Sequence, residues 1–136
     1  MALDDIDKLI IKELQKDSKI TMKMLGEIVN LTGQAVNMRI ARLESEGVIE
    51  NYTITVNQNR LGCEVHAFIT VYMHKISHQP FLDFVDKESI YIINNYKIIG
   101  DGCYLLECRF PSNRYLDEFL VKLNNFANYK VSTVLK

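Results

Sequence analysis

The chain has 136 residues, of which 48% are hydrophobic and 24% charged, so we expect one ordinary domain or two very small ones. No apolar run approaches the roughly 20 residues that cross a bilayer, and the acidic start MALDDIDKL lacks the layout of a signal peptide. Three cysteines then fit free thiols in a reducing compartment, and the net charge of -1 does not by itself indicate nucleic acid. We expect a soluble cytoplasmic protein with no membrane partner.

Apolar residues at helical spacing predict three short helices within residues 3–47. Thr21 and Thr32 are expected to cap the second and third helices, because a threonine oxygen can accept a hydrogen bond from a free amide of the first turn. A tight turn at Asn30 separates these helices, and Gly47 ends the third as a glycine C-cap. The inward-facing positions are Leu3, Ile6, Leu9, Ile10, Leu14, Leu25, Ile28, Val29, Val36, Ile40 and Leu43.

After Gly47 the hydrophobic period becomes that of strands. Alternation from Val48 to Val56 predicts a linking strand, and the polar run from Asn57 to Gly62 predicts a hinge. Further strands are expected at 63–73, 90–99, 103–110 and 129–135, with helices that begin at Pro80 and Ser112. Three helices followed by βαββαβ indicate an α+β chain with a helix-turn-helix and a ferredoxin-like domain.

These patterns predict a DNA-binding helix-turn-helix domain at 1–50, a linking strand and hinge at 51–62, and a βαββαβ domain at 63–136. We expect apolar side chains on both faces of the sheet, because the alternate strand positions include Phe68, Tyr72 and either Ile92 or Ile93. Because the domain has only one layer of helices, the second face predicts a partner. A homodimer is the economical hypothesis.

The third helix is predicted to have an outer face suited to DNA. With Val36 at zero on a helical wheel, Ile40 and Leu43 lie within about 40° of it and face the core. The opposite side carries Gln34, Asn37, Met38, Ala41 and Ser45. Gln and Asn side chains can bond bidentately to adenine, and an apolar side chain can contact a thymine methyl group. We therefore predict that Gln34, Asn37 and Met38 read bases.

The same segment has a local excess of positive charge. Between residues 19 and 42, four basic residues stand against the single acid Glu27. Such a stripe can meet phosphates, and it can equally be an ordinary solvated face. The predicted phosphate-anchoring residues are Thr32, Arg39 and Arg42, supported by Lys19, Thr21 and Lys23.

No catalytic residue, metal site or cofactor is predicted. His66 and His74 would lie on one strand about 26 Å apart, too far to share a metal ion. Cys103 and Cys108 are five positions apart on another strand, so they point to opposite faces and form neither a chelate nor a disulfide. The turn at Gly100–Gly102 lacks the following helix that a phosphate-binding loop requires. No pattern in the sequence pairs a nucleophilic side chain with a general base, so we do not expect an enzyme.

The run Leu31–Gly62, LTGQAVNMRIARLESEGVIENYTITVNQNRLG, resembles the signature of the Lrp/AsnC, or feast/famine, transcriptional regulators of prokaryotes. The opening Leu3–Ile20, LDDIDKLIIKELQKDSKI, also resembles the first helix of the family. Because members of the family have a winged or strand-flanked helix-turn-helix followed by a βαββαβ sensor domain, the resemblance extends over nearly the whole chain. The matching positions of the signature are Thr32, Val36, Arg39, Arg42-Leu43-Glu44 and Gly47-Val48-Ile49. The resemblance implies a DNA-binding helix-turn-helix and a second domain that dimerises through its sheet, with dimers that assemble into octamers or open spirals.

The resemblance also implies an effector site at the hairpin around residue 100. In the family this hairpin carries a Gly-x-x-Asp type motif at the dimer–dimer interface, where amino acids bind. Here Cys103 replaces the usual Asp, so a carboxylate for an ammonium group is missing at that position, although Asp101 is nearby. The candidate effector-binding residues are Gly100, Asp101, Gly102, Cys103 and Tyr104.

The principal hypothesis is a sequence-selective, double-stranded-DNA-binding transcriptional regulator that acts as a dimer or larger assembly. A first alternative is a nucleoid-type architectural protein that bridges or wraps DNA with little sequence preference; the weak net charge argues mildly against it. A second alternative is a metabolite-sensing module or enzyme that has lost DNA binding, against which the intact helix-turn-helix speaks.

Overall fold

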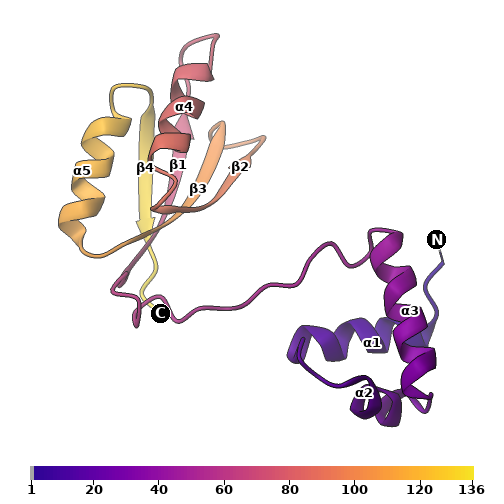
Figure 1. Cartoon of the computed structure of the whole chain (residues 1–136). Helices are drawn as coiled ribbons and strands as arrows, with labels where there is room; N and C mark the ends of the chain where they lie inside the picture. The colour runs from indigo at the N-terminus through magenta and orange to yellow at the C-terminus, as the bar shows by residue number, and fades with distance from the viewer. Residues whose placement is uncertain (1) are drawn as a thin grey trace. The chain divides into compact units, whose positions relative to one another are not determined.

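A computed structural model describes residues 2–136, which form two compact units, one ending at Thr55 and the other beginning at Val56. Each unit buries its own cluster of apolar side chains. Figure 1 labels the helices and strands of both units. In its described part the first unit contains three helices and no strand, and the second combines a sheet with two helices.

The first unit contains α1 (Asp5–Lys16), α2 (Met22–Val29) and α3 (Gly33–Ser45). Its core consists of Ile10, Leu25, Val29, Val36, Ile40 and Leu43. All six were expected to face inward from their helical spacing. Ile28, also expected inside, remains 44% exposed, because α2 has only two turns and buries a narrow stripe.

The predicted caps of the second and third helices are confirmed. Thr21 Oγ1 accepts a hydrogen bond from the Met24 amide at 3.1 Å, and Thr32 Oγ1 accepts one from the Ala35 amide at 3.1 Å. Between them Asn30 adopts the left-handed conformation, with φ of 58°, that reverses the chain in so short a turn. Gly47 follows the C-cap of α3 with φ of 75°, as predicted for a glycine at this position.

The linking strand predicted from Val48 to Val56 is wrong. Residues 51–57 belong to no helix or strand, and within residues 2–136 no strand pairs with them. Alternation of apolar residues is necessary for a half-buried strand, but a strand also needs a neighbour to complete its hydrogen bonds. Without one, Ile54 is 78% exposed. The predicted hinge from Asn57 to Gly62 is a series of turns.

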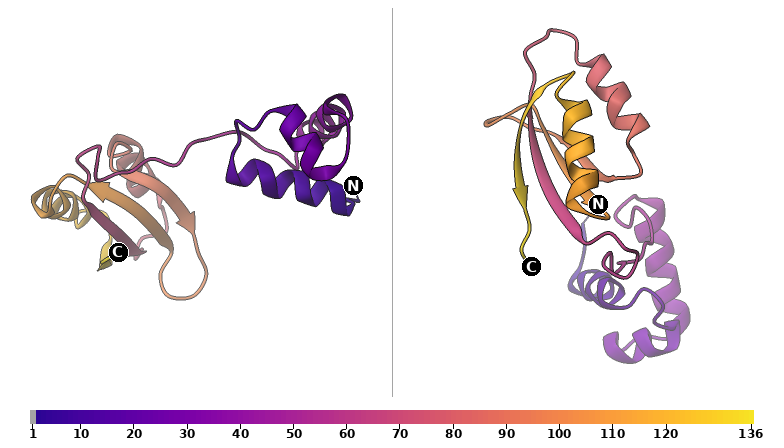
Figure 2. Two further views of the ribbon diagram at one scale, coloured as in Figure 1. Left: turned by 90° about the horizontal axis from the view of Figure 1, so that it is seen from below. Right: turned by 90° about the vertical axis from the view of Figure 1, so that its left-hand side faces the viewer.

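The second unit has the predicted ferredoxin-like order βαββαβ, built from β1 (Val65–Tyr72), α4 (Gln79–Lys87), β2 (Ile92–Lys97), β3 (Tyr104–Phe110), α5 (Asn113–Leu123) and β4 (Asn128–Thr133). The strands lie in the order β2-β3-β1-β4, and every neighbouring pair is antiparallel. Both helices cover the same face of the sheet (Figure 2). Pro80 lies in the first turn of α4 as expected, whereas Ser112 precedes α5 without a side-chain capping bond.

Alternation along β1 and β3 separates the two faces of the sheet. Ala67, Ile69 and Val71 of β1 are fully buried under the helices, as are Leu106 and Cys108 of β3. The intervening residues lie on the open face, which no helix covers, and most are half-buried; they are His66, Phe68, Thr70, Tyr72, Leu105, Glu107 and Arg109. The sequence left open whether Ile92 or Ile93 faces away from the core. β2 has a bulge between Ile92 and Asn94; Ile92 packs on the core, and Ile93 is 46% exposed.

Candidate nucleic-acid interface

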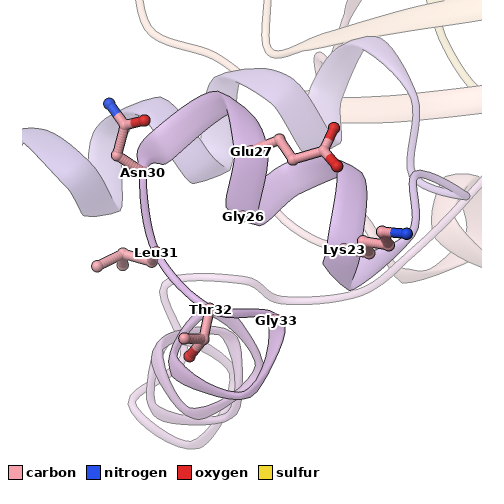
Figure 3. A pocket seen from close by; sticks show the side chains of 7 residues that line it. All are labelled: Lys23, Gly26, Glu27, Asn30, Leu31, Thr32 and Gly33. Carbon is pink, nitrogen blue, oxygen red and sulfur yellow. The ribbon is translucent and has the colours of Figure 1, made fainter.

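The helix-turn-helix consists of α2, the turn at Asn30 and Leu31, and α3. A shallow hollow opens where the turn leads into α3 (Figure 3). It is lined by Lys23, Gly26, Glu27, Asn30, Leu31, Thr32 and Gly33. Two predicted DNA-contacting residues, Lys23 and Thr32, therefore border the same surface. Thr32 reaches it while its hydroxyl oxygen also caps α3.

The predicted base-reading face of α3 is open to solvent. Gln34 and Asn37 are exposed, and Met38 is 68% exposed. The opposite side of the helix, with Val36 and Ile40, is buried against α1 and α2. The three candidate base readers thus share one accessible helical face, as their spacing predicted.

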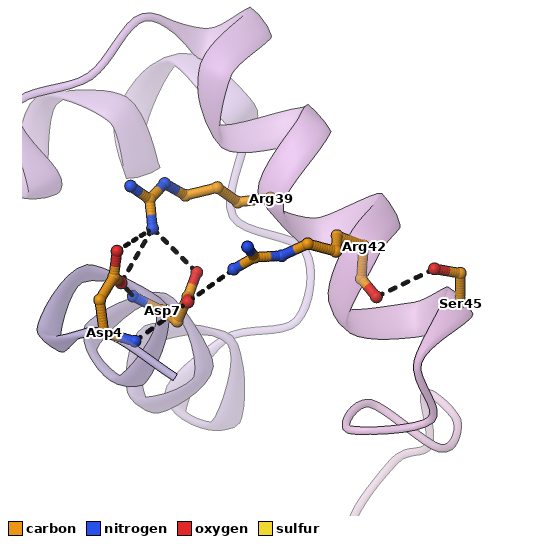
Figure 4. Close-up of polar contacts among 5 residues, drawn as sticks. All are labelled: Asp4, Asp7, Arg39, Arg42 and Ser45. Atoms are coloured by element: carbon orange, nitrogen blue, oxygen red, sulfur yellow. Dashed lines mark hydrogen bonds and ion pairs between the residues drawn. The ribbon is translucent and has the colours of Figure 1, made fainter. Parts of the chain in front are cut away.

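The two predicted phosphate-binding arginines of α3 are engaged within the unit. Arg39 Nη1 donates to Asp4 Oδ1 at 2.8 Å, to Asp4 Oδ2 at 2.7 Å and to Asp7 Oδ1 at 3.0 Å. Arg42 Nη2 donates to Asp7 Oδ2 at 2.7 Å. Figure 4 shows both guanidinium groups reaching from α3 to the start of α1. We name these four residues the Asp–Arg cluster.

The acids of the Asp–Arg cluster are also tied to each other. Asp4 is the N-cap of α1: its Oδ1 accepts from the Asp7 amide at 2.7 Å, and Asp7 Oδ2 accepts from the Asp4 amide at 3.2 Å. Hydrogen bonds from Arg39, and then from the Asp7 amide, lower the pKa of Asp4 from 3.8 to about 2. The same contact with Asp4 raises the pKa of Arg39. Asp7 is the one buried charged residue among those described, at 1% exposure.

Sequence reasoning missed Asp4 and Asp7. The spacing Asp-x-x-Asp at the start of a helix was a signal for a capping box, in which residues three apart bond reciprocally. Nothing in the sequence pairs these acids with arginines 32 or 35 residues away, because that contact depends on how α1 packs against α3. The remaining predicted residues, Lys19 and Lys23, are exposed, and Lys19 lies in the turn after α1.

The hairpin predicted to bind an effector lies between β2 and β3. Gly100 and Gly102 have φ of 120° and 95°, and the Cys103 amide donates to the Val71 carbonyl at 2.8 Å. Asp101 accepts a hydrogen bond from the Tyr72 hydroxyl at 2.9 Å. Tyr104 is buried at 5% exposure, and its hydroxyl oxygen lies 2.9 Å from His78 Nδ1. Of the five candidates, Asp101 and Gly100 are exposed.

Two details of the predicted strands need correction. β3 begins at Tyr104, so Cys103 precedes the strand and packs against the core cluster that contains Cys108, whereas the predicted strand put these two residues on opposite faces. β1 ends at Tyr72, which leaves His74 beyond the strand, 2.7 Å from Asn128 Nδ2. Cys108 is buried, as expected of a small hydrophobic residue, and burial raises the pKa of its thiol to about 12.

Within residues 2–136 there is no group of three or more His, Cys, Asp or Glu side chains placed to hold a metal ion. None of the helices in that range has the length and apolar character needed to cross a membrane.

Comparison with known proteins assigns the chain to a family. Residues 3–50 match the winged helix-turn-helix DNA-binding family. The HTH-type transcriptional regulator LrpA of Bacillus subtilis is 54% identical over 133 residues, which cover 98% of each chain. The chain belongs to the Lrp/AsnC family of transcriptional regulators. The resemblance seen in the motifs of the helix-turn-helix is thereby confirmed.

Solved structures of Lrp-type proteins share the fold over the whole chain. B. subtilis LrpC superposes with a TM-score of 0.93 at 31% identity, covering 100% of this chain and 96% of LrpC. The feast or famine regulatory protein of M. tuberculosis, solved in complex with L-methionine, gives a TM-score of 0.85 at 28% identity and covers 99% and 93% of the two chains.

Proposed function

We propose that this Lrp/AsnC regulator binds double-stranded DNA selectively by placing α3 in the major groove. The exposure of Gln34, Asn37 and Met38 on one face of the second helix of a helix-turn-helix carries the proposal. A helix fits the major groove, where each base pair presents a distinct pattern of donors and acceptors. Thr32 and Lys23 border the neighbouring hollow, where a phosphate of the backbone would pass.

The working form is a homodimer or a larger assembly of dimers. Half-buried apolar side chains on the open face, including Phe68 and Leu105, support a partner surface. On the same face Arg109 Nε is buried without a hydrogen-bond partner among the described residues, a donor that a second copy could satisfy. Two recognition helices related by a two-fold axis would favour a roughly palindromic operator.

A small-molecule effector, an amino acid, is proposed for the hairpin from Gly100 to Tyr104. The complex of the M. tuberculosis relative with L-methionine supports an amino acid as the class of ligand. Asp101 is the exposed carboxylate of this hairpin, so it is the candidate partner of an ammonium group. The activity is that of a regulator in the cytoplasm, and no catalytic step is assigned.

A DNA titration tests the proposal. The protein is titrated on the DNA upstream of its own gene and on scrambled DNA of the same composition, across a salt series, with and without a panel of amino acids. We expect tighter binding to the upstream DNA at every salt concentration. Equal affinity for both would favour an architectural protein, and no binding to either at low salt would leave a sensor module without DNA binding. Effector control predicts that one amino acid shifts the affinity.

A further inference from the structure

The Asp–Arg cluster holds two carboxylates against two guanidinium groups, so its net charge is zero. The local excess of positive charge that first indicated phosphate binding depends on Arg39 and Arg42. With both engaged, Lys19 and Lys23 stand against Glu27 as the remaining charges of that segment. A DNA phosphate that approaches Arg39 therefore meets a guanidinium already bonded to anions.

The two acids of the cluster differ in accessibility. The Asp7 side chain is 1% exposed, whereas that of Asp4 is 53% exposed and that of Arg39 is 28% exposed. The bonds between Arg39 and Asp4 therefore lie at the surface, where a phosphate oxygen can compete with the carboxylate for the same donor. The Asp7–Arg42 bond holds a buried carboxylate, and its loss would leave Arg39 as the one guanidinium group bonded to that charge.

We propose that Asp4 competes with DNA phosphate for Arg39 and so limits the sequence-independent affinity for DNA, while Asp7 positions α3 through Arg39 and Arg42. The inference rests on the proposed DNA-binding function. Affinity for DNA of any sequence depends mainly on how many phosphates are neutralised, and base contacts add the discrimination. By withholding Arg39 from phosphate, Asp4 lowers the sequence-independent affinity for DNA. The base contacts of α3 then contribute a larger share of the total binding free energy.

The test replaces Asp4 by Asn. An Asn side chain is also a favourable N-cap, since its amide oxygen can accept from the Asp7 amide, but it has no negative charge for Arg39. Asp4→Ser, another capping residue, is a second variant. Asp5→Asn is the matched control: Asp5 is exposed in the same turn and, among the described residues, is bonded to neither arginine. Thermal unfolding confirms that each variant is folded.

The readout is the dependence of log affinity on log salt for upstream and scrambled DNA. We expect Asp4→Asn to steepen the slope by about 0.9, the contribution of one additional phosphate contact. Affinity for scrambled DNA and for upstream DNA should both rise at low salt, because a phosphate contact does not depend on sequence. In an Arg39→Gln background the same substitution should have no effect on the slope.

The inference would be overturned by an equal change in Asp5→Asn, by a persistent effect in the Arg39→Gln background, or by weaker binding of Asp4→Asn at unchanged slope. The last would mean that Asp4 holds Arg39 in place for DNA instead of away from it. Wild-type protein that binds neither DNA would refute the proposed function and this inference together. Wild-type binding with an unaltered Asp4→Asn slope would refute the inference alone.

Discussion

Gly26 in α2 lies directly against the carbonyl group of Leu31 in the turn that leads to α3. A Cβ atom at position 26 would be 2.4 Å from the Leu31 oxygen, closer than real Cβ contacts come. The Leu31 amide also donates to the Gly26 carbonyl at 2.9 Å. Because both contacts involve backbone atoms, the chain cannot relieve the overlap by turning a side chain. Gly26 therefore sets how closely the two helices of the helix-turn-helix approach.

Gly26→Ala should destabilise the first unit by about 1–3 kcal/mol, the usual cost of forcing extra atoms into a packed site. Gly33→Ala is the matched control, since its Cβ would meet its nearest neighbour, the Met22 carbonyl carbon, at an ordinary 3.5 Å. There alanine should be neutral or stabilising, because glycine lowers helix stability. Denaturant unfolding, combined with hydrogen exchange at the amides of α2 and α3, measures both. Equal stabilities would contradict this account of the turn.

Much of the first unit could be predicted because its signals are local. Thr21 and Thr32 cap helices that begin one residue later, and Val36, Ile40 and Leu43 share a face through the helical period alone. The Asp–Arg cluster could not be predicted in this way. Its bonds join residues 32 to 35 positions apart, and a sequence pattern does not say which charged residues two packed helices bring together.

The errors in the second half have a similar cause. The segment from Val48 to Val56 has the alternation of a strand, but pairing depends on a neighbour that lies elsewhere. The odd spacing of Cys103 and Cys108 predicts opposite faces only if both lie in one regular strand. β3 begins at Tyr104, so this spacing does not set the direction of Cys103. The faces of β1 and of β3 from Tyr104 onward were predictable, since a regular strand alternates strictly and its apolar residues mark the covered side.

Asn37→Ala should weaken binding to the operator by about 1–3 kcal/mol and relax the preference at one base-pair position, if Asn37 bonds bidentately to an adenine. Affinity for scrambled DNA should stay within about twofold, because Asn37 has no charge to neutralise phosphate. Competition binding with operators altered one base pair at a time locates the relaxed position. Asn124→Ala, in the turn after α5, is the control. A uniform loss at all positions would contradict base reading by Asn37.

Acid should weaken the second unit through Glu107. Hydrogen bonds from Asn94 Nδ2 at 2.8 Å, and then from His66 Nε2 at 2.6 Å, lower the pKa of Glu107 from its ordinary 4.5. A carboxyl group whose pKa is lower in the folded state stabilises above its ordinary pKa, and this contribution is lost as pH falls through the lower, folded value. Glu107→Gln should therefore cost more stability at pH 7 than at pH 3.

Denaturant midpoints of wild type and Glu107→Gln at several pH values measure this difference. Glu64→Gln, an exposed residue just before β1, provides the control for removing one negative charge from the unit. A cost that is the same at pH 7 and pH 3 would mean that the carboxylate of Glu107 does not matter and that only its size and shape contribute.

The open face of the sheet provides the last prediction. Phe68 is half-buried there and lies opposite Glu107 of β3. Phe68→Lys should leave the single unit folded, because the new cation faces an acid across the strands. In a dimer through this face, the lysine of each copy is buried in the interface and loses hydration. We expect dimerisation to weaken by about 3 kcal/mol, which is more than 100-fold in the dissociation constant.

Val121→Lys is the matched control, since Val121 is an apolar residue of α5 that is 64% exposed on the helical layer. Sedimentation equilibrium should find Val121→Lys in the same assembly as wild type and Phe68→Lys at the monomer mass of 15.8 kDa. Dissociation by Val121→Lys with an intact Phe68→Lys assembly would place the partner surface on the helices. Because a palindromic operator needs two recognition helices at once, Phe68→Lys should also lose selective DNA binding at protein concentrations where wild type is dimeric.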